Sequence, residues 1–548
     1  MVVVTPAESL ARARELDQPA FICLVEDPSG SSATGPLAGT TFAIKDNIDL
    51  AGVPTTAADP RVDTPAATSA PAVQRLVDAG AVAIGKTNLD QYATGLVGTR
   101  SPYGACHAVD SSDHVSGGSS SGSAVAVAAG VVDFALGTDT AGSGRVPAAF
   151  NGLVGVKPSR GLVPTRGTVP ACASLDCVTV LTRSVGLART VLDVMAGPDR
   201  DDPWSRRLVQ ALVPRRPVLA VPDVLPGLDA VHEKAWLASL ERATDLGDTL
   251  VVDVSPLLEA AELLYSGPWL AERTLAFGDR LADDPAVDPT VRAIVTGAPP
   301  YDGPGVFAAF HRLAELARQA APVWETADAL LLPVTCTHPT LAEVGADPVG
   351  VNTRLGRFTN MTNLLDLCAV AVPGPERDDG LPFGVQLLAP AGHDLAVLDL
   401  AARWCGEEPV PAPGGNGGVR VAVAGAHLSG QPLNGDLVAR GGRLVGTTRT
   451  AADYRMYVVD GPLPRPGLTR TAAGAVAGPG LEVEVWELPR EGVGSLLESV
   501  LPPLAIGPLE LADGTQVLGF VCTAEAVDPT RDITAHGGWR AWLAAASG

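Results

Sequence analysis

The sequence is poor in basic residues, and among these lysine is especially scarce. It has 548 residues with 39 Lys and Arg against 61 Asp and Glu, so its formal net charge is −22. Nucleic acids and anionic membranes bind basic surfaces, and we therefore expect neither as a partner. Lysine occurs only at Lys45, Lys86, Lys157 and Lys234. Arginine keeps its proton in proteins, whereas a buried lysine can be neutral and act as a base, so these few positions are candidate bases.

Long apolar runs are also missing, although 46% of the residues are hydrophobic. No run of 18 apolar residues occurs, so we expect no membrane-spanning helix. The N-terminus has no basic leader before a long apolar core, which predicts no signal peptide. The eight cysteines are scattered, and the nearest pair, Cys172 and Cys177, fits neither a CxxC nor a zinc motif. We expect reduced thiols and a cytoplasmic protein.

Motifs for bound metals and organic cofactors are absent from the sequence as well. The eight histidines are spread along the chain, and none follows a GxSxG elbow. Neither a metal-ligand cluster, nor a dinucleotide fingerprint, nor a P-loop is present. We therefore expect no metal and no cofactor.

A Pro/Gly-rich break divides the chain into two parts. Residues 407–418 read EEPVPAPGGNGG, which predicts an interdomain linker. Residues 1–406 alternate predicted strands with predicted helices, which indicates an α/β domain with a mixed sheet covered by helices. Residues 419–548 carry β patterns such as LEVEVWEL at 481–488, and we expect a smaller C-terminal α+β domain there. The predicted strands of the first part are 40–49, 81–84, 131–136, 217–221, 330–333 and 385–388, and its helices are 8–17, 69–79, 123–129, 230–247, 305–321 and 393–405.

The most informative stretch runs from Gly117 to Arg145. It reads GGSSSGS, then an Ala/Val run, then LGTDTAGSGR. The small residues around Ser143 leave successive backbone N–H groups uncovered, and such donors stabilise the negative charge that develops in acyl transfer. A flexible linker does not run into an apolar stretch and a glycine-rich turn, so we interpret the segment as part of a catalytic site.

Together with ALGTDTAGSGRVPAAFNGLVGVKPS, this stretch resembles the amidase signature family over the first domain. The resemblance implies amide hydrolysis by a Ser–Ser–Lys triad. Ser143 would be the nucleophile, Ser119, in a cis peptide, would relay the proton, and Lys45, in the segment FAIKD, would be the base. The oxyanion hole would be the backbone at Thr140, Ala141, Gly142 and Ser143.

The residues themselves are compatible with that chemistry. A serine needs a base to attack an amide, and Lys45 can serve only if burial lowers its pKa. Asp46 would oppose this, but neighbours on a strand point to opposite faces. Lys86 is the alternative base. We expect Arg145 to be structural and to pair with an acid near the turn.

A second resemblance concerns substrate choice. YSGPWLAER at 265–273 resembles the segment with which allophanate hydrolases hold their substrate, which implies contacts from Tyr265 and Arg273. A guanidinium grips a carboxylate through two parallel hydrogen bonds. The alternative is that Tyr265 belongs to the core and Arg273 to a helix surface.

A third resemblance lies in the second domain. AHLSGQPLN at 426–434, with the LEVEVWEL strand, is similar to the C-terminal domain of allophanate hydrolases, which has a γ-glutamyl cyclotransferase-like fold. His427 is there a candidate proton donor or anion contact, with a structural role as the alternative.

The resemblances together imply hydrolysis of the terminal amide of allophanate, with release of ammonia and N-carboxycarbamate. The second domain would help decarboxylate that product. We expect urea carboxylase as a candidate partner and a homo-oligomeric state. Two other functions stay open, the amidase subunit of a tRNA-dependent amidotransferase and a binding protein with an inactive amidase fold.

Overall fold

The computed structural model describes residues 4–26, 28, 34–211, 216–281, 284–297, 301–408, 418–459, 464–472, 478–523, 525 and 527–546. Most of the linker predicted at 407–418 therefore lies outside the described residues. Internal contacts divide the chain into two compact units, which we describe separately. The first comprises residues 1–208 and 216–410, and the second 209–215 and 411–548. The sequence pattern did not indicate that 209–215 would group with the second unit.

The first unit is built on a mixed sheet of eleven strands, in the order β1-β3-β2-β6-β8-β7-β12-β13-β11-β9-β10. Parallel pairs join β2 to both β3 and β6, and β9 to both β10 and β11, whereas the other neighbours are antiparallel. A separate hairpin pairs β4 with β5. The strands are β1 (Phe21–Leu24), β2 (Thr41–Lys45), β3 (Val82–Thr87), β4 (His107–Ala108), β5 (Ser111–Val115), β6 (Phe134–Asp139), β7 (Val154–Lys157), β8 (Cys177–Thr182), β9 (Val218–Pro222), β10 (Asp248–Val252), β11 (Ala329–Pro333), β12 (Leu367–Pro373) and β13 (Gly384–Pro390).

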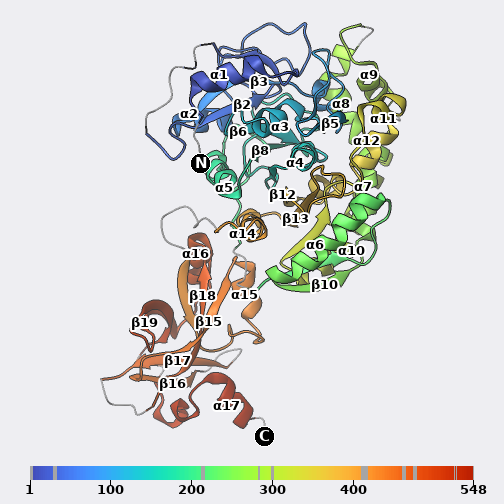
Figure 1. The fold of residues 1–548 in the computed structure, drawn as a ribbon. Helices are drawn as coiled ribbons and strands as arrows, with labels where there is room; N and C mark the ends of the chain where they lie inside the picture. The colour runs from blue at the N-terminus through green and yellow to red at the C-terminus, as the bar shows by residue number, and fades with distance from the viewer. Residues whose placement is uncertain are drawn as a thin grey trace. The chain divides into compact units, whose positions relative to one another are not determined.

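Helices cover this sheet, as Figure 1 shows. The small side chains of α3, SGSAVAVA, are almost all buried, whereas α7 and α10 pack on the far strands through apolar faces. The predicted α/β fold with a helix-covered mixed sheet is confirmed. The helices are α1 (Pro6–Glu15), α2 (Pro71–Asp78), α3 (Ser121–Ala128), α4 (Arg145–Phe150), α5 (Val185–Met195), α6 (Ala230–Leu246), α7 (Ser255–Ser266), α8 (Leu270–Phe277), α9 (Pro289–Thr296), α10 (Gly303–Thr326), α11 (Leu341–Ala346), α12 (Gly350–Leu355), α13 (Asn360–Leu364) and α14 (Asp394–Trp404).

Two strands differ from their predicted limits in a way that matters for the site. The strand predicted over 40–49 ends at Lys45, because the N–H of Ile48 bonds back to the Lys45 carbonyl at 2.9 Å and the chain turns. The strand predicted over 131–136 begins at Phe134, because Val131 donates to Ala126 at 2.9 Å and continues the turn after α3. The second shift makes Asp139 the last residue of β6.

The start of α3 packs directly on neighbouring backbone. A Cβ added at Gly122 would meet the carbonyl oxygen of Ala20 at 2.2 Å and the backbone nitrogen of Asn88 at 2.7 Å. A side chain at this position is therefore excluded unless the backbone moves. The residues just before α3, including Ser119, are held against the sheet by this contact.

The second unit is a smaller α+β fold, as predicted. Its five-stranded sheet has the order β15-β18-β14-β20-β19, with β14 and β20 parallel, and β16 pairs with β17 in a separate hairpin. Its core gathers apolar side chains from both, including Trp486, Leu468 and Trp539. The strands are β14 (Val419–Val423), β15 (Arg443–Arg449), β16 (Tyr454–Val459), β17 (Arg465–Arg470), β18 (Glu482–Leu488), β19 (Leu504–Glu510) and β20 (Gln516–Cys522), and the helices are α15 (Asn434–Ala439), α16 (Arg490–Ser499) and α17 (Trp539–Ala546).

Two further findings concern the chain as a whole. All eight cysteines are free thiols. Among the described residues, no helix combines the length and the apolar character needed to cross a membrane.

Candidate active site

The sheet topology brings the predicted catalytic segments together. Strands β2 and β6 are parallel neighbours, so their carboxyl ends lie at the same edge of the sheet. Lys45 is the last residue of β2, and Asp139 is the last residue of β6. The turn that carries Ser143 begins directly after Asp139. Segments far apart in the sequence thus meet at one edge.

Lys45 is fully buried and contacts Ser119. Its Nζ lies 2.8 Å from the Ser119 Oγ and 2.8 Å from the Thr138 Oγ1. Burial lowers the pKa of Lys45 to about 7, although the carboxylates of Asp90, Asp176 and Asp139 act in the opposite direction. An amine with this pKa is partly neutral near pH 7 and can accept a proton from a hydroxyl.

Ser119 lies in a backbone arrangement that ties it to the Ser143 segment. The Gly118–Ser119 peptide is cis. The next residue, Ser120, donates its N–H to the Ser143 carbonyl at 3.3 Å, and its hydroxyl donates to the Thr138 carbonyl at 3.2 Å. The two serine segments are therefore linked through hydrogen bonds to the backbone.

The Ser143 side chain is buried, with the residue 3% exposed. Its hydroxyl donates to the Gly95 carbonyl at 3.4 Å, which is at the long limit for a hydrogen bond. Among the described contacts of Ser143 there is no hydrogen bond to the Ser119 hydroxyl. A rotation of the Ser143 side chain would be needed to complete a Ser143–Ser119–Lys45 relay, and loose geometry of this kind is common in sites without substrate.

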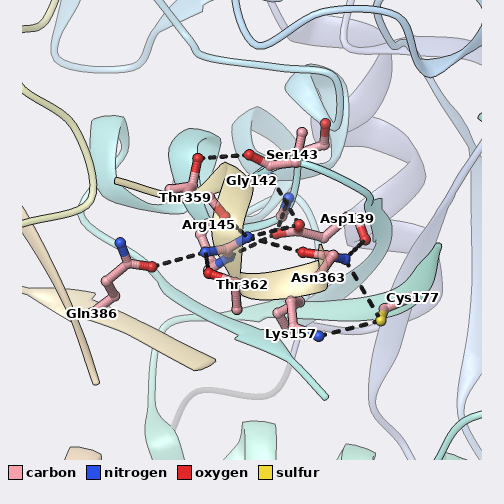
Figure 2. A network of polar contacts seen from close by, with 12 residues as sticks. Asp139, Gly142, Ser143, Arg145, Lys157, Cys177, Thr359, Thr362, Asn363 and Gln386 are labelled. Carbon is pink, nitrogen blue, oxygen red and sulfur yellow. Dashed lines mark hydrogen bonds and ion pairs between the residues drawn. The ribbon is translucent and has the colours of Figure 1, made fainter. Parts of the chain in front are cut away.

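The turn around Ser143 is held by a buried ion pair (Figure 2). The Arg145 Nε lies 2.9 Å from Asp139 Oδ2, and neither side chain is exposed. The same carboxylate accepts the N–H groups of Gly142 at 2.7 Å and Gly144 at 3.2 Å. Burial raises the pKa of Asp139, but the Arg145 charge and the hydrogen bonds to the carboxylate more than offset this, and the pKa is lowered overall. The prediction that Arg145 pairs with an acid near the turn is confirmed.

Three distant segments complete this polar network. Arg145 donates to the side chains of Thr362 at 2.8 Å and Gln386 at 2.9 Å. Asn363 donates to the carbonyl of Asp139 at 2.7 Å, and the Thr359 hydroxyl donates to that of Ala141 at 2.6 Å. Figure 2 shows these side chains converging on the turn. The network fixes the backbone on both sides of Ser143.

The predicted oxyanion hole contains one amide that is already used. The N–H of Gly142, a residue with φ of +125°, is taken by Asp139. The N–H groups of Thr140, Ala141 and Ser143 have no partner in the described part of the chain. Free amide donors beside the nucleophile are what an oxyanion requires.

The alternative base, Lys86, lies in a different environment. It is fully buried, and its Nζ lies 3.0 Å from Asp46 Oδ1 and 3.1 Å from the Thr55 hydroxyl. Lys45 and Asp46 therefore point to different neighbours, as expected for adjacent strand residues. A buried lysine paired with a carboxylate keeps its charge, so the structure favours Lys45 over Lys86 as a base. The third buried lysine, Lys157, donates to the Pro158 carbonyl at 2.7 Å.

Arg273 is buried in α8 rather than exposed on a helix surface. It donates to the Thr94 hydroxyl at 2.8 Å. No carboxylate lies within ion-pair distance of it among the described residues. Its charge contributes to the lowered pKa of Lys45, and it also acts on Asp176, whose pKa burial raises to about 6. A buried guanidinium without a counter-ion, close to the candidate base, can bind an anion.

Tyr265 is half-buried at the end of α7. It packs against a cluster that contains Ala141, Cys172 and Trp269. It also lines a cavity of about 460 Å³. No hydrogen bond joins Tyr265 to Arg273 among the described contacts.

Sequence reasoning missed two polar residues of the site. Thr138 shares the Lys45 amine with Ser119, and Asp176 accepts the Thr140 hydroxyl and the N–H groups of Ala171 and Cys172. Thr138 lies inside the GTDTAGSGR segment and could have been noticed. Asp176 carries no local signal.

His427 lies in the second unit, in a pocket of about 90 Å³. Asp436, Arg465 and Phe520 also line it, and the imidazole stacks on the Phe520 ring with centroids 5.1 Å apart. Burial lowers the pKa of His427. Over the residues described in the two units, no group of three or more His, Cys, Asp or Glu side chains is placed to hold a metal.

Comparison with known families covers both units. The Amidase family profile matches residues 1–398, and that of the allophanate hydrolase C-terminal domain matches residues 419–544. A urea amidolyase of Lachancea kluyveri is 40% identical over 547 residues, which are 93% of this chain and 30% of the relative. The chain thus spans less than a third of that relative's length.

Two further comparisons separate the candidate functions. A solved allophanate hydrolase of Kluyveromyces lactis is 36% identical, with a TM-score of 0.75, and the match covers 98% of this chain and 97% of that one. One component of the glutamyl-tRNA(Gln) amidotransferase of Haloarcula marismortui is 33% identical over 414 residues, which are 66% of this chain and 94% of the relative. The first match extends over both units, and the second is shorter.

We predict that Lys45 acts as a neutral base. The pKa of about 7 means that the amine is protonated below pH 7 and neutral above it, so amide hydrolysis should rise with pH through about 7. Lys45→Arg keeps the charge but cannot give up its proton, and it should be as inactive as Lys45→Ala. The measurement is the pH profile of kcat/KM. Lys234→Arg, at a lysine that is 69% exposed, is the control and should behave as wild type. An active Lys45→Arg enzyme would contradict the assignment.

Proposed function

The chain belongs to the amidase family and also carries an allophanate hydrolase C-terminal domain, and on this basis we propose that it is an amidohydrolase that converts allophanate to ammonia and N-carboxycarbamate. The observation that carries the catalytic part is the 2.8 Å contact between the Lys45 amine and the Ser119 hydroxyl in a fully buried site. The similarity to allophanate hydrolase over both units supports the choice of substrate.

In this proposal, neutral Lys45 takes a proton from Ser119 while Ser119 takes one from Ser143. The Ser143 Oγ attacks the carbonyl carbon of the terminal amide. The N–H groups of Thr140, Ala141 and Ser143 stabilise the resulting oxyanion, and Gly142 contributes by shaping the turn. The proton then returns along the same chain to the nitrogen, which leaves as ammonia. Water hydrolyses the acyl-enzyme by the reverse path and releases N-carboxycarbamate.

The substrate is a small planar anion, and Arg273 is the group proposed to bind its carboxylate. The absence of an ion-pair partner for Arg273 in the described residues supports this role. Tyr265 is proposed to contact the substrate through its hydroxyl. The second domain is proposed to assist decarboxylation of N-carboxycarbamate, with His427 as its candidate residue. We propose domain limits of 1–406 and 419–548 for these two activities, with the linker between them.

The rival functions are less well supported. A component of an amidotransferase would share the triad, but the match to such a protein covers two thirds of the chain. An inactive binding protein would have no need for a desolvated lysine beside a serine. Urea carboxylase is proposed as the source of substrate, a cytoplasmic location is proposed with it, and the homo-oligomeric state stays a prediction.

The proposed function predicts that the purified chain releases ammonia from allophanate. Ser143→Ala should abolish this release, because no other nucleophile is placed to replace it. A fluorophosphonate should label wild type and not the variant. Substantial ammonia release by Ser143→Ala would refute the assignment of the nucleophile. An inactive wild type that also resists labelling would favour the binding protein.

Arg273→Lys should weaken allophanate hydrolysis far more than hydrolysis of a neutral amide of similar size. Lysine keeps the charge but loses the two-pronged grip on a carboxylate, a loss of about 1.5–3 kcal/mol. The measurement is kcat/KM on both substrates. Equal losses would mean that Arg273 supports the fold through Thr94 and does not recognise the anion.

His427→Ala should leave the first ammonia unchanged and delay the second ammonia and carbon dioxide. N-carboxycarbamate would then decompose only at its solution rate. The measurement is a time course of both products from one allophanate sample, with His536→Ala, an exposed histidine of the same unit, as the control. A chain cut at Pro413 should show the full delay. Superimposable time courses for all the enzymes would assign the second domain to stability or assembly.

A further inference from the structure

The cavity beside Tyr265 has a charge that differs from that of the protein as a whole. The chain carries a formal net charge of −22. Arg354 and Arg357 line this cavity, with Glu262 as its one acidic residue. Clefts lined by one sign of charge concentrate ligands of the opposite sign. An anionic substrate approaching an acidic protein would meet a locally positive surface here.

The two guanidinium groups are weakly neutralised by the rest of the protein. Arg357 is half-buried and donates to the Pro226 carbonyl at 3.0 Å, and among the described residues no carboxylate lies within ion-pair distance of it. Arg354 has a single carboxylate partner in the described part of the chain, Asp347 at 3.7 Å, with both side chains about half exposed. Ion pairs of this kind contribute little, so both cations remain able to attract an anion.

The inner wall of the cavity carries an unpaired acceptor. Asn360 is 4% exposed and lines the cavity, and its side-chain Oδ1 has no hydrogen-bond partner among the described residues. A buried polar atom without a partner is costly. An amide N–H from a ligand would satisfy it. The cavity therefore offers cations for a carboxylate and an acceptor for an amide group.

This inner wall is joined to the turn that carries Ser143. Asn360 follows Thr359, whose hydroxyl donates to the Ala141 carbonyl at 2.6 Å. Tyr265, on the same wall, packs in the cluster that contains Ala141. The cavity thus borders the structure that holds the nucleophile.

We propose that this cavity is the entry vestibule for an anionic amide, in which Arg357, aided by Arg354, attracts the carboxylate and Asn360 accepts the amide N–H before the substrate reaches Ser143. The inference rests on the proposed function, since it takes allophanate as the anion. It adds a capture step ahead of the grip assigned to Arg273. Arg357 acts on the encounter and leaves the chemical step to the triad.

The test compares Arg357→Glu and Arg357→Lys with Arg318→Glu in the full chain. Arg318 is an exposed residue of α10 outside the cavity, so its variant changes the net charge equally. Arg357→Glu should lower kcat/KM for allophanate about ten-fold at low salt while kcat stays nearly unchanged. The lysine variant should retain most of kcat/KM, because it keeps the charge. Raising the ionic strength should reduce kcat/KM of wild type but not of Arg357→Glu.

Thermal unfolding and malonate binding complete the design. The loss of the Pro226 contact would lower the Tm of both Arg357 variants, whereas the loss of charge affects only the glutamate variant. Calorimetric titration of the full chain with malonate, a small dicarboxylate, measures attraction without turnover, so it remains valid if wild type releases no ammonia from allophanate and the proposed function fails. Binding should be weaker in Arg357→Glu than in Arg318→Glu. Equal kcat/KM, equal salt dependence and equal malonate affinity in these two variants would overturn the vestibule.

Discussion

A carboxylate and a guanidinium meet at 2.9 Å behind the nucleophile turn, and neither side chain is exposed to solvent. Taking either partner away would leave an uncompensated buried charge, which costs about 3–5 kcal/mol. Asp139 also accepts two amides of the turn, and Arg145 donates to Thr362 and Gln386, which come from much later in the sequence. The pair thus joins the turn to these distant segments, and the position of Ser143 depends on all of them.

Burial has opposite consequences for the two charged residues at the ends of β2 and β6. Asp139 has a counter-ion at contact distance and remains ionised, with a lowered pKa. Lys45 has hydroxyl partners in place of a carboxylate, so desolvation dominates and its pKa falls to about 7. The same low-dielectric environment therefore supports a permanent charge at one strand end and a proton acceptor at the next.

The sequence predicted the residues whose signal is local. Ser119, Ser143 and Lys45 lie in recognisable segments, and the fold class followed from alternating strand and helix patterns. Limits were less accurate where backbone turns overrode the apolar pattern, as at Val131. The contacts of Thr359 and the lack of a counter-ion for Arg273 in the described structure depend on pairings across long sequence separations, and no periodicity records them. Roles for the site residues remain proposals for experiment.

The burial of lysine has a practical consequence for handling this protein. Lys45, Lys86 and Lys157 have no solvent exposure, whereas Lys234 is 69% exposed and pairs with Asp378 on the surface. Amine-reactive dyes and coupling resins need an accessible, deprotonated side chain. Among the lysine side chains, coupling should therefore occur at one position on α6, far along the sequence from the triad, and should give surfaces on which the molecules share a single orientation.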